Sequence, residues 1–224
     1  MSRYLAPIFT IVWKDVVLET RTKDIVTAVL AFSLLVIVVF NFAIDPTPRT
    51  VGLVAPGILW IAFVFGGVLG LNRSFTLEKD NGSIHALMLA PVSREVIFFG
   101  KTLSNLVFML VVELITLPVF AMLFNYSLQV VELLPVMLLA TLGIVTVGSV
   151  FSSMAVHTRA REVMLPLLFL PVALPAVIAA VEISGAVLAG EGILTNMEWL
   201  AVLVAFDAIF LVVCPIAFNA IVED

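Results

Sequence analysis

Six long apolar stretches, separated by short polar segments, run through this chain of 224 residues. A stretch of about 20 apolar residues is long enough to cross the hydrocarbon core of a bilayer as an α-helix. The pattern therefore predicts membrane-spanning helices at 25–43, 51–71, 102–124, 133–156, 163–181 and 199–222. These spans leave no room for a separate soluble domain, so we expect an all-α membrane protein with a single domain over residues 1–224.

The segment before the first span predicts a helix that lies in the membrane surface. Lys14 and Asp15 interrupt its apolar run too early for a cleavable signal peptide. Aromatic and basic residues are interleaved with apolar ones, as is typical of an interfacial amphipathic helix. Its predicted apolar face holds Ile8, Ile11, Val12, Val16 and Leu18.

Composition agrees with a membrane protein, because 62% of the residues are hydrophobic and only 12% are charged. The placement of the 11 Lys and Arg residues is more informative than the net charge of −5. Four lie in the N-terminal segment, four in 72–101 and two in 157–162, whereas the connections on the other side hold only Arg49. Because cytoplasmic loops are enriched in positive residues, this predicts a multi-pass protein with both termini in the cytoplasm.

The longest polar connection, residues 77–101, predicts a short helix between two longer ones. Ile84, Leu87 and Met88 fall on one face of this helix, and Pro91 ends it. Ser93 can cap the next helix, which enters the third span. Since one or two helical turns are unstable alone in water, the apolar face requires a partner. The alternative is a surface loop that packs on its own protein.

Two connections on the other side of the membrane differ in length. Residues 45–48, Asp-Pro-Thr-Pro, predict a tight turn, because proline cannot continue a helix. Residues 182–198 carry glutamates and glycines around a short apolar core. Either a shallow hairpin that dips toward the bilayer or a plain loop fits this second connection.

The chain has no pattern of a catalytic or metal site. Gly100-Lys101-Thr102 resembles the end of a phosphate-binding loop, but Glu95 stands where the first glycine is needed and no strand precedes it. We therefore expect a non-catalytic chain, with any ATP hydrolysis on a separate subunit. His85 and His157 fall in predicted cytoplasmic connections, so no axial haem ligand is evident within the membrane.

A few polar and small residues inside the spans are candidates for function. Glu113 lies in the middle of the third span, where an ionisable group costs at least about 2.5 kcal/mol unless it is neutral, paired or wet. It either lines a translocation path, pairs across a dimer seam, or is a protonated packing residue. Gly66 with Gly70, and Gly148 with Ser152, allow close helix approach within the chain or at such a seam.

Several motifs together resemble known transporters. The spacing of Glu78, Gly82-Ser83-Ile84, Leu87, Pro91, Arg94 and Gly100-Lys101 resembles a stretch of ABC-2 type transporter permeases. More narrowly, VAPGILWIAF (54–63), LNRSF (71–75), DNGSIHALMLAP (80–91), FLPVALPAVIAA (169–180) and CPIAFNA (214–220) resemble the family of cytochrome c maturation protein B, also called haem exporter protein B. The sequence departs from the family pattern at Asn72, where an acid is common, at Ile84, where leucine is usual, and in having Glu113.

The resemblance implies an ABC-2 type exporter fold, with six transmembrane helices, an N-terminal interfacial helix and a cytoplasmic coupling helix. It implies a permease in the inner membrane that dimerises and pairs with a separate ABC ATPase, which binds the ATP. Haem is then the expected substrate, and the companions are haem-handling membrane proteins of c-type cytochrome maturation; no bound cofactor, metal or nucleic acid is expected on this chain. The implied ATPase contact comprises Glu78, Asp80, Gly82, Ile84, Leu87, Met88, Pro91 and Arg94.

Two alternatives to haem export stay open. One is an ABC-2 permease for a drug or a lipid. The other is a non-transporting subunit that couples ATP hydrolysis to release of a haem chaperone from a partner protein. The residues alone do not distinguish either alternative from transport of haem through this chain.

Overall fold

The computed structural model describes residues 2–44, 47–80, 92–126, 128–155 and 161–223, and all regular secondary structure within these ranges is helical. The α-helices are α1 (Ser2–Thr22), α2 (Asp24–Ala43), α3 (Pro48–Asp80), α5 (Arg94–Leu123), α6 (Leu134–Ala155), α7 (Arg161–Leu188) and α8 (Met197–Glu223). Two short 3₁₀ helices, η1 (Leu128–Leu133) and η2 (Ile193–Asn196), precede α6 and α8.

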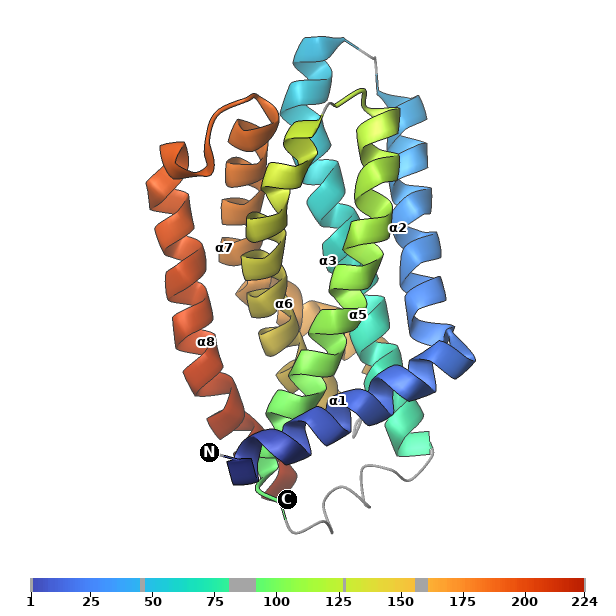
Figure 1. The fold of residues 1–224 in the computed structure, drawn as a ribbon, viewed down its shortest axis with the longest axis vertical. Coiled ribbons are helices and arrows are strands. Elements are labelled where there is room, and N and C mark those ends of the chain that lie inside the picture. Colours follow the sequence, from blue (N-terminus) through green and yellow to red (C-terminus); the bar gives the residue numbers. More distant parts are fainter. Residues whose placement is uncertain (1, 45–46, 81–91, 127, 156–160, 224) are drawn as a thin grey trace.

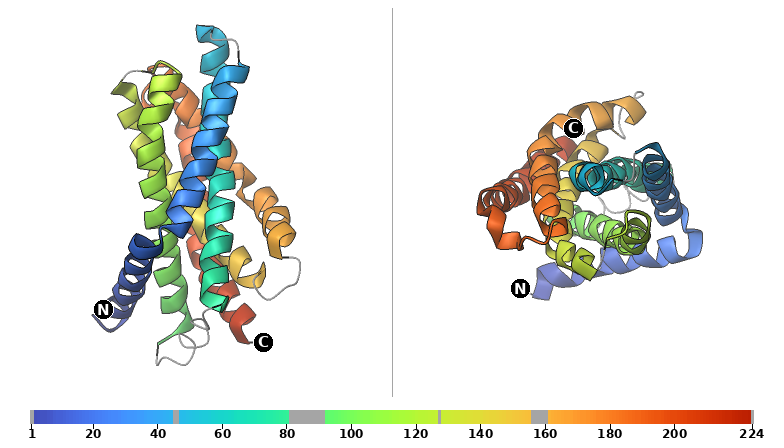
Figure 2. Two further views of the ribbon diagram at one scale, coloured as in Figure 1. Left: turned by 90° about the vertical axis from the view of Figure 1, so that its right-hand side faces the viewer. Right: turned by 90° about the horizontal axis from the view of Figure 1, so that it is seen from above.

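Helices α2, α3, α5, α6, α7 and α8 form an upright bundle in which successive helices run in opposite directions (Figures 1 and 2). The same bundle contains six segments long and apolar enough to cross a membrane, from Asp24–Ala43 to Ile193–Ile221. The prediction of an all-α protein with six spanning helices is therefore confirmed. Helix α1 crosses the lower end of the bundle in Figure 1, the end at which both termini lie.

Two spanning helices extend further than the sequence predicted. Helix α3 continues through the polar residues 72–80, because no proline or glycine interrupts that segment. Helix α7 continues to Leu188, so residues 182–188 are helical, and both the hairpin and the plain loop were wrong for them. The chain turns away from the helix axis at Gly190, two residues after the helix end, with a φ of 87°. The N–H of Gly190 bonds to the carbonyl of Val187, and that of Glu191 to the carbonyl of Ala186, which is a Schellman arrangement.

The first connection at the upper end includes residues 45 and 46, which lie outside the described residues, so the tight turn there stays a prediction. Helix α3 begins at Pro48, a position that tolerates proline because the first helical N–H has no partner within the helix. Thr47 precedes it, and its hydroxyl accepts a hydrogen bond from the backbone N–H of Thr50 at 3.3 Å. The threonine thus satisfies one of the free donors at the start of the helix.

Helices α1 and α2 are joined by a single residue, Lys23, whose φ of 56° reverses the chain direction. The carboxylate of Glu19, one turn earlier in α1, accepts hydrogen bonds from the backbone N–H groups of Ile25 at 2.9 Å and Val26 at 2.8 Å. A side chain of one helix therefore caps the next helix. Burial raises the pKa of the Glu19 carboxyl above its ordinary value, although these two N–H groups act in the opposite direction.

The buried face of α1 differs from the predicted one. Ile11 is buried as expected, but Leu18, assigned to the apolar face, is exposed. Asp15 and Glu19 are buried instead. An ion pair compensates the charge of Asp15, and backbone N–H groups compensate that of Glu19. The contact with α5 is close: a Cβ atom added to Gly100 would lie 2.9 Å from the Cβ of Ile11. Helix α1 is thus held against the bundle by polar as well as apolar contacts.

Candidate functional site

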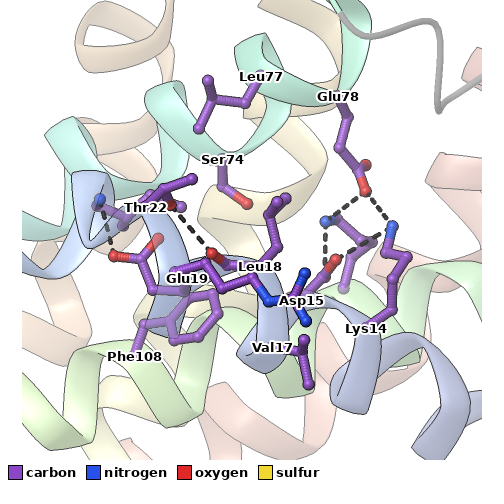
Figure 3. A pocket seen from close by; sticks show the side chains of 13 residues that line it. Lys14, Asp15, Val17, Leu18, Glu19, Thr22, Ser74, Leu77, Glu78 and Phe108 are labelled. Carbon is purple, nitrogen blue, oxygen red and sulfur yellow. Dashed lines mark hydrogen bonds and ion pairs between the residues drawn. The ribbon is translucent and has the colours of Figure 1, made fainter.

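Four charged side chains from three helices meet at the lower end of the bundle, and we call them the charged cluster. Its members are Lys14 and Asp15 of α1, Glu78 of α3 and Lys101 of α5 (Figure 3). The Nζ atom of Lys101 lies 2.7 Å from Oδ2 of Asp15 and 2.8 Å from Oε1 of Glu78. The Nζ atom of Lys14 lies 2.9 Å from the same Glu78 oxygen and 3.1 Å from Oδ1 of Asp15. Each carboxylate is thus shared by both ammonium groups.

The charged cluster is mostly removed from solvent. The exposed fractions of its side chains are 4% for Lys101, 7% for Asp15 and 8% for Glu78, against 42% for Lys14. Burial by itself lowers the pKa of Lys14, but Glu78 and Asp15 raise it more, so the net shift is upward. Breaking a buried ion pair by removing one partner typically costs about 3–5 kcal/mol, whereas exposed pairs contribute little. Lys101 is therefore the member on which the other charges depend most.

A cavity of about 400 Å³ lies beside the charged cluster, between α1, α3 and α5 and the start of α2. Glu78 and Lys14 border it on one side (Figure 3). Ser74, Leu77 and Phe108 form part of the remaining wall. The ion pairs of Lys14 and Lys101 connect α1, α3 and α5 beside this cavity, while Ile11 and Gly100 keep α1 and α5 in direct contact.

The predicted ATPase contact falls partly outside the described residues. Gly82, Ile84, Leu87, Met88 and Pro91 lie there, as does the side chain of Asp80. The two remaining residues of the set, Glu78 and Arg94, lie on either side of this segment. Glu78 belongs to the charged cluster, and Nη1 of Arg94 donates a hydrogen bond to the backbone carbonyl of Asn219 in α8 at 3.3 Å. Both ends of the connection 81–91 are therefore attached to the helical bundle.

Ser93 takes the predicted position immediately before α5. Its carbonyl accepts hydrogen bonds from the backbone N–H groups of Val96 at 3.0 Å and Ile97 at 3.4 Å. Its side chain, however, makes no capping hydrogen bond. The helix therefore starts where the sequence indicated, but the hydroxyl does not contribute to that start.

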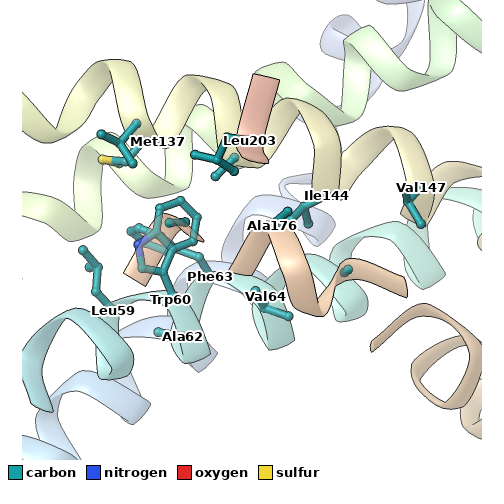
Figure 4. Close-up of a cluster of buried hydrophobic side chains, with 14 of the residues drawn as sticks. Leu59, Trp60, Ala62, Phe63, Val64, Met137, Ile144, Val147, Ala176 and Leu203 are labelled. Carbon is teal, nitrogen blue, oxygen red and sulfur yellow. The ribbon is translucent and has the colours of Figure 1, made fainter. Parts of the chain in front are cut away.

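Above the charged cluster the interior is apolar. Trp60, Met137, Ala176 and Leu203, from α3, α6, α7 and α8, belong to one buried group (Figure 4). The indole N–H of Trp60 donates a hydrogen bond to the hydroxyl of Ser184 at 2.9 Å, which satisfies the one polar atom of the ring. The apolar side chains of this buried group cannot compensate a charge placed among them.

Glu113 lies inside this bundle, between α5 and α6, and its exposed fraction is 0%. The hydroxyl of Thr141 donates a hydrogen bond to its Oε1 atom at 2.5 Å. Its Oε2 atom has no hydrogen-bond partner among the described residues. The side chain is thus enclosed by its own chain. Its role in a translocation path stays a prediction.

The small residues singled out in the sequence lie at contacts within the chain. A Cβ atom on Gly66 would lie 2.9 Å from the hydroxyl of Ser33, and one on Gly70 would lie 2.9 Å from the side chain of Val29, so both glycines allow α3 to approach α2. A Cβ on Gly148 would collide with Leu71 of α3. Ser152 is buried one turn further along α6.

Sequence reasoning missed the charged cluster, although it noted all four of its members singly. Lys14 and Asp15 were noted as an interruption of an apolar run, Lys101 as part of a family motif, and Glu78 as part of the predicted ATPase contact, but none was predicted to pair with another. A usable signal was present: Ile11, Asp15 and Glu19 recur at a spacing of four and share one face of α1 with apolar residues. An acid on an apolar face indicates a buried partner, but the sequence does not say which cation supplies it.

The fold and the charged cluster define a polytopic helical membrane protein whose first helix is bound to one end of its bundle. The family model described as "CcmB protein" matches residues 6–224. The chain belongs to this family.

Individual relatives agree with the family match. The chain is 29% identical over 189 residues to the protein named heme exporter protein B of Paracoccus denitrificans, covering 84% of this chain and 87% of that protein. It is 29% identical over 155 residues to the protein of the same name from Rhodobacter capsulatus, covering 69% and 71%. Against the Pseudomonas aeruginosa protein of that name, identity is 26% over 192 residues and 85% of each chain is covered.

Proposed function

We propose that this chain is the membrane-spanning permease subunit of an ATP-driven ABC complex that exports haem, or hands it over, for c-type cytochrome assembly. The observation that carries the proposal is the family match over nearly the whole chain, with relatives named heme exporter protein B. The six spanning helices support a permease role. The single permease domain covers residues 1–224.

In this proposal the lower end of the bundle faces the cytoplasm of a cell with an inner membrane. The support is the concentration of Lys and Arg residues in α1, near the end of α3 and at the start of α5, with Arg49 at the other end. A separate ABC ATPase docks on the connection 81–91 and hydrolyses ATP. A second copy of the chain and haem-handling membrane proteins of the cytochrome c maturation system complete the complex.

The charged cluster supplies the mechanical part of the proposal. Movement of the connection 81–91 would be transmitted directly to α3 and α5, because α3 precedes this connection in the sequence and α5 follows it. Asp15 binds Lys101 of α5, and Lys14 binds Glu78 of α3, so α1 would follow these helices. Glu113 and the glycine contacts lie further along α5, α3 and α6, where such a movement would change helix packing.

The docking site is tested by a double substitution, Leu87→Asp with Met88→Asp. Burying the Ile84, Leu87 and Met88 side chains would contribute roughly 1.5–3 kcal/mol each to docking, so the double variant should lose the ATPase on purification. A matched control places two aspartates at exposed apolar positions of the upper end, Leu194→Asp with Met197→Asp. Copurification of the ATPase should survive in the control. Undiminished copurification with the Leu87/Met88 variant would contradict the docking site.

Absorption spectroscopy of the purified complex tests the substrate. A haem spectrum that depends on this chain supports haem handling. Its absence, together with a drug- or lipid-stimulated ATPase activity, would favour the permease alternative. Haem that stays on a partner protein and leaves with its chaperone only on ATP hydrolysis would favour the non-transporting subunit.

A further inference from the structure

A groove of about 520 Å³ opens on the side of the bundle between α2, α3 and α7. Its upper part is apolar and is lined by Phe32, Phe65, Val68 and Leu69. Val68 is buried at its floor, whereas Phe65 and Leu69 are more than 40% exposed at its edge. This part faces the level of the hydrocarbon, since α2 and α3 both span the membrane here.

The groove becomes polar toward its lower end, where Asn72, Arg73 and Thr76 form the wall. From Phe65 to Thr76 the wall follows α3 for three turns, about 16 Å at 1.5 Å per residue. One leaflet of the hydrocarbon core is about 15 Å thick, half of the bilayer value. The groove as a whole thus reaches from the polar end into the hydrocarbon level, and its apolar part, Phe65 to Leu69, follows α3 for about 6 Å, enough for the first part of one acyl chain.

The charges at this polar end are of both signs and lie side by side. Nη2 of Arg73 lies 3.5 Å from Oδ2 of Asp24, and both side chains are about half exposed, at 50% and 43%. Asp24 is the one ion-pair partner of Arg73 among the described residues, and this contact of 3.5 Å engages one of the five guanidinium N–H donors. The charges of Asp24 and Arg73 both act on the nearby Glu19 carboxyl. Arg73 and Asp24 thus place one cation and one carboxylate side by side, which fits a ligand that carries an anionic and a cationic group next to each other.

We propose that this groove binds one phosphatidylethanolamine molecule, with its phosphate on Arg73, its ammonium group on Asp24 and an acyl chain along Phe32 and Phe65. The guanidinium group is suited to a phosphate, to which it can donate two parallel hydrogen bonds. A primary ammonium group can donate hydrogen bonds to the Asp24 carboxylate. The quaternary ammonium of phosphatidylcholine has no N–H donor, and phosphatidylglycerol has no cation. The pairing of charges therefore selects a zwitterionic lipid with a primary amine.

Native mass spectrometry of the purified full chain tests the proposal. The chain is mixed with phosphatidylethanolamine, phosphatidylcholine or phosphatidylglycerol of the same acyl chains, and the bound lipid is counted at equal concentration. Phosphatidylethanolamine should bind at least about tenfold more tightly than the other two, the ratio expected for one hydrogen bond between charged groups. Asp24→Asn and Arg73→Gln should each remove this preference. Arg49→Gln, a matched substitution of an exposed arginine at the upper end, should keep it.

A second measurement locates the lipid without weakening the site. Phe32→Trp keeps an aromatic ring on the groove wall and adds a fluorophore. Brominated phosphatidylethanolamine should quench the added fluorescence more strongly than brominated phosphatidylcholine. Equal quenching by both lipids, equal binding of all three lipids, or equal loss in Arg49→Gln would overturn the proposal.

Two further outcomes would assign the groove to a different occupant. A disulfide-linked dimer formed efficiently through Leu69→Cys in native membranes would show that a second copy covers it. Displacement of the bound lipid by stoichiometric haem would assign it to haem. None of these measurements needs an ATPase or cytochrome assembly, so their failure would leave the proposed function standing.

Discussion

Two sites in this molecule bury carboxylates in different ways. In the charged cluster, Asp15 and Glu78 face two ammonium groups at 2.7–3.1 Å. Glu113, higher in the bundle, has a single hydroxyl donor and no cation within ion-pair distance among the described residues. The first arrangement compensates two full charges and joins three helices. The second suits a group that is neutral or bound to water, because an isolated charge at that depth is costly.

The largest expected effect is at the charged cluster. Lys101→Met removes the most buried described cation and leaves the half-exposed Lys14 as the one described cation beside Asp15 and Glu78. We expect a loss of about 3–5 kcal/mol in the free energy of unfolding, measured by chemical denaturation of the purified chain in detergent. Lys14→Met is the matched control and should cost less than about 1 kcal/mol. Equal losses in the two variants would show that burial does not distinguish the two lysines.

The next effect concerns the hydrogen bond of Glu113. Thr141→Val removes its only described donor while keeping the side-chain volume, and should cost about 1–3 kcal/mol of the same unfolding free energy. Thr146→Val in the same helix is the control, because that hydroxyl donates only to the carbonyl of Leu142 one turn earlier. If Thr141→Val is no more costly than Thr146→Val, the hydrogen bond to Glu113 contributes nothing.

The smallest effect on stability, and the sharpest test of the comparison, is expected for Glu113→Gln. The amide has nearly the same volume and can still accept the hydrogen bond from Thr141, so membrane levels should be normal. The yield of c-type cytochrome in a complemented deletion strain should fall, because the carboxyl group and its proton exchange are lost. Normal cytochrome yields for both Glu113→Gln and Glu113→Leu, at normal membrane levels of the protein, would show that Glu113 has only a packing role.

Hydropathy was sufficient to predict the six spans, because a segment that crosses the bilayer must be apolar along its length. It underestimated α3 and α7, since polar residues such as Arg73 and Glu78 continue a helix as readily as apolar ones once it has left the hydrocarbon. The charged cluster could not be predicted, because Asp15 and Lys101 are 86 residues apart in the sequence and meet only through packing of α1 on α5. The enclosure of Glu113 likewise depends on which face of α5 meets α6.

The single-residue junction at Lys23 has a mechanical consequence. Consecutive Cα atoms are fixed about 3.8 Å apart, so one linking residue gives α1 and α2 almost no slack. The carboxylate of Glu19, bonded to the first N–H groups of α2, stiffens the corner further. Helix α1, at the lower surface of the bundle, and the spanning helix α2 are therefore rigidly joined. A change in the thickness or lateral tension of the lower leaflet that tilts α1 would therefore exert a torque on α2, and the reverse.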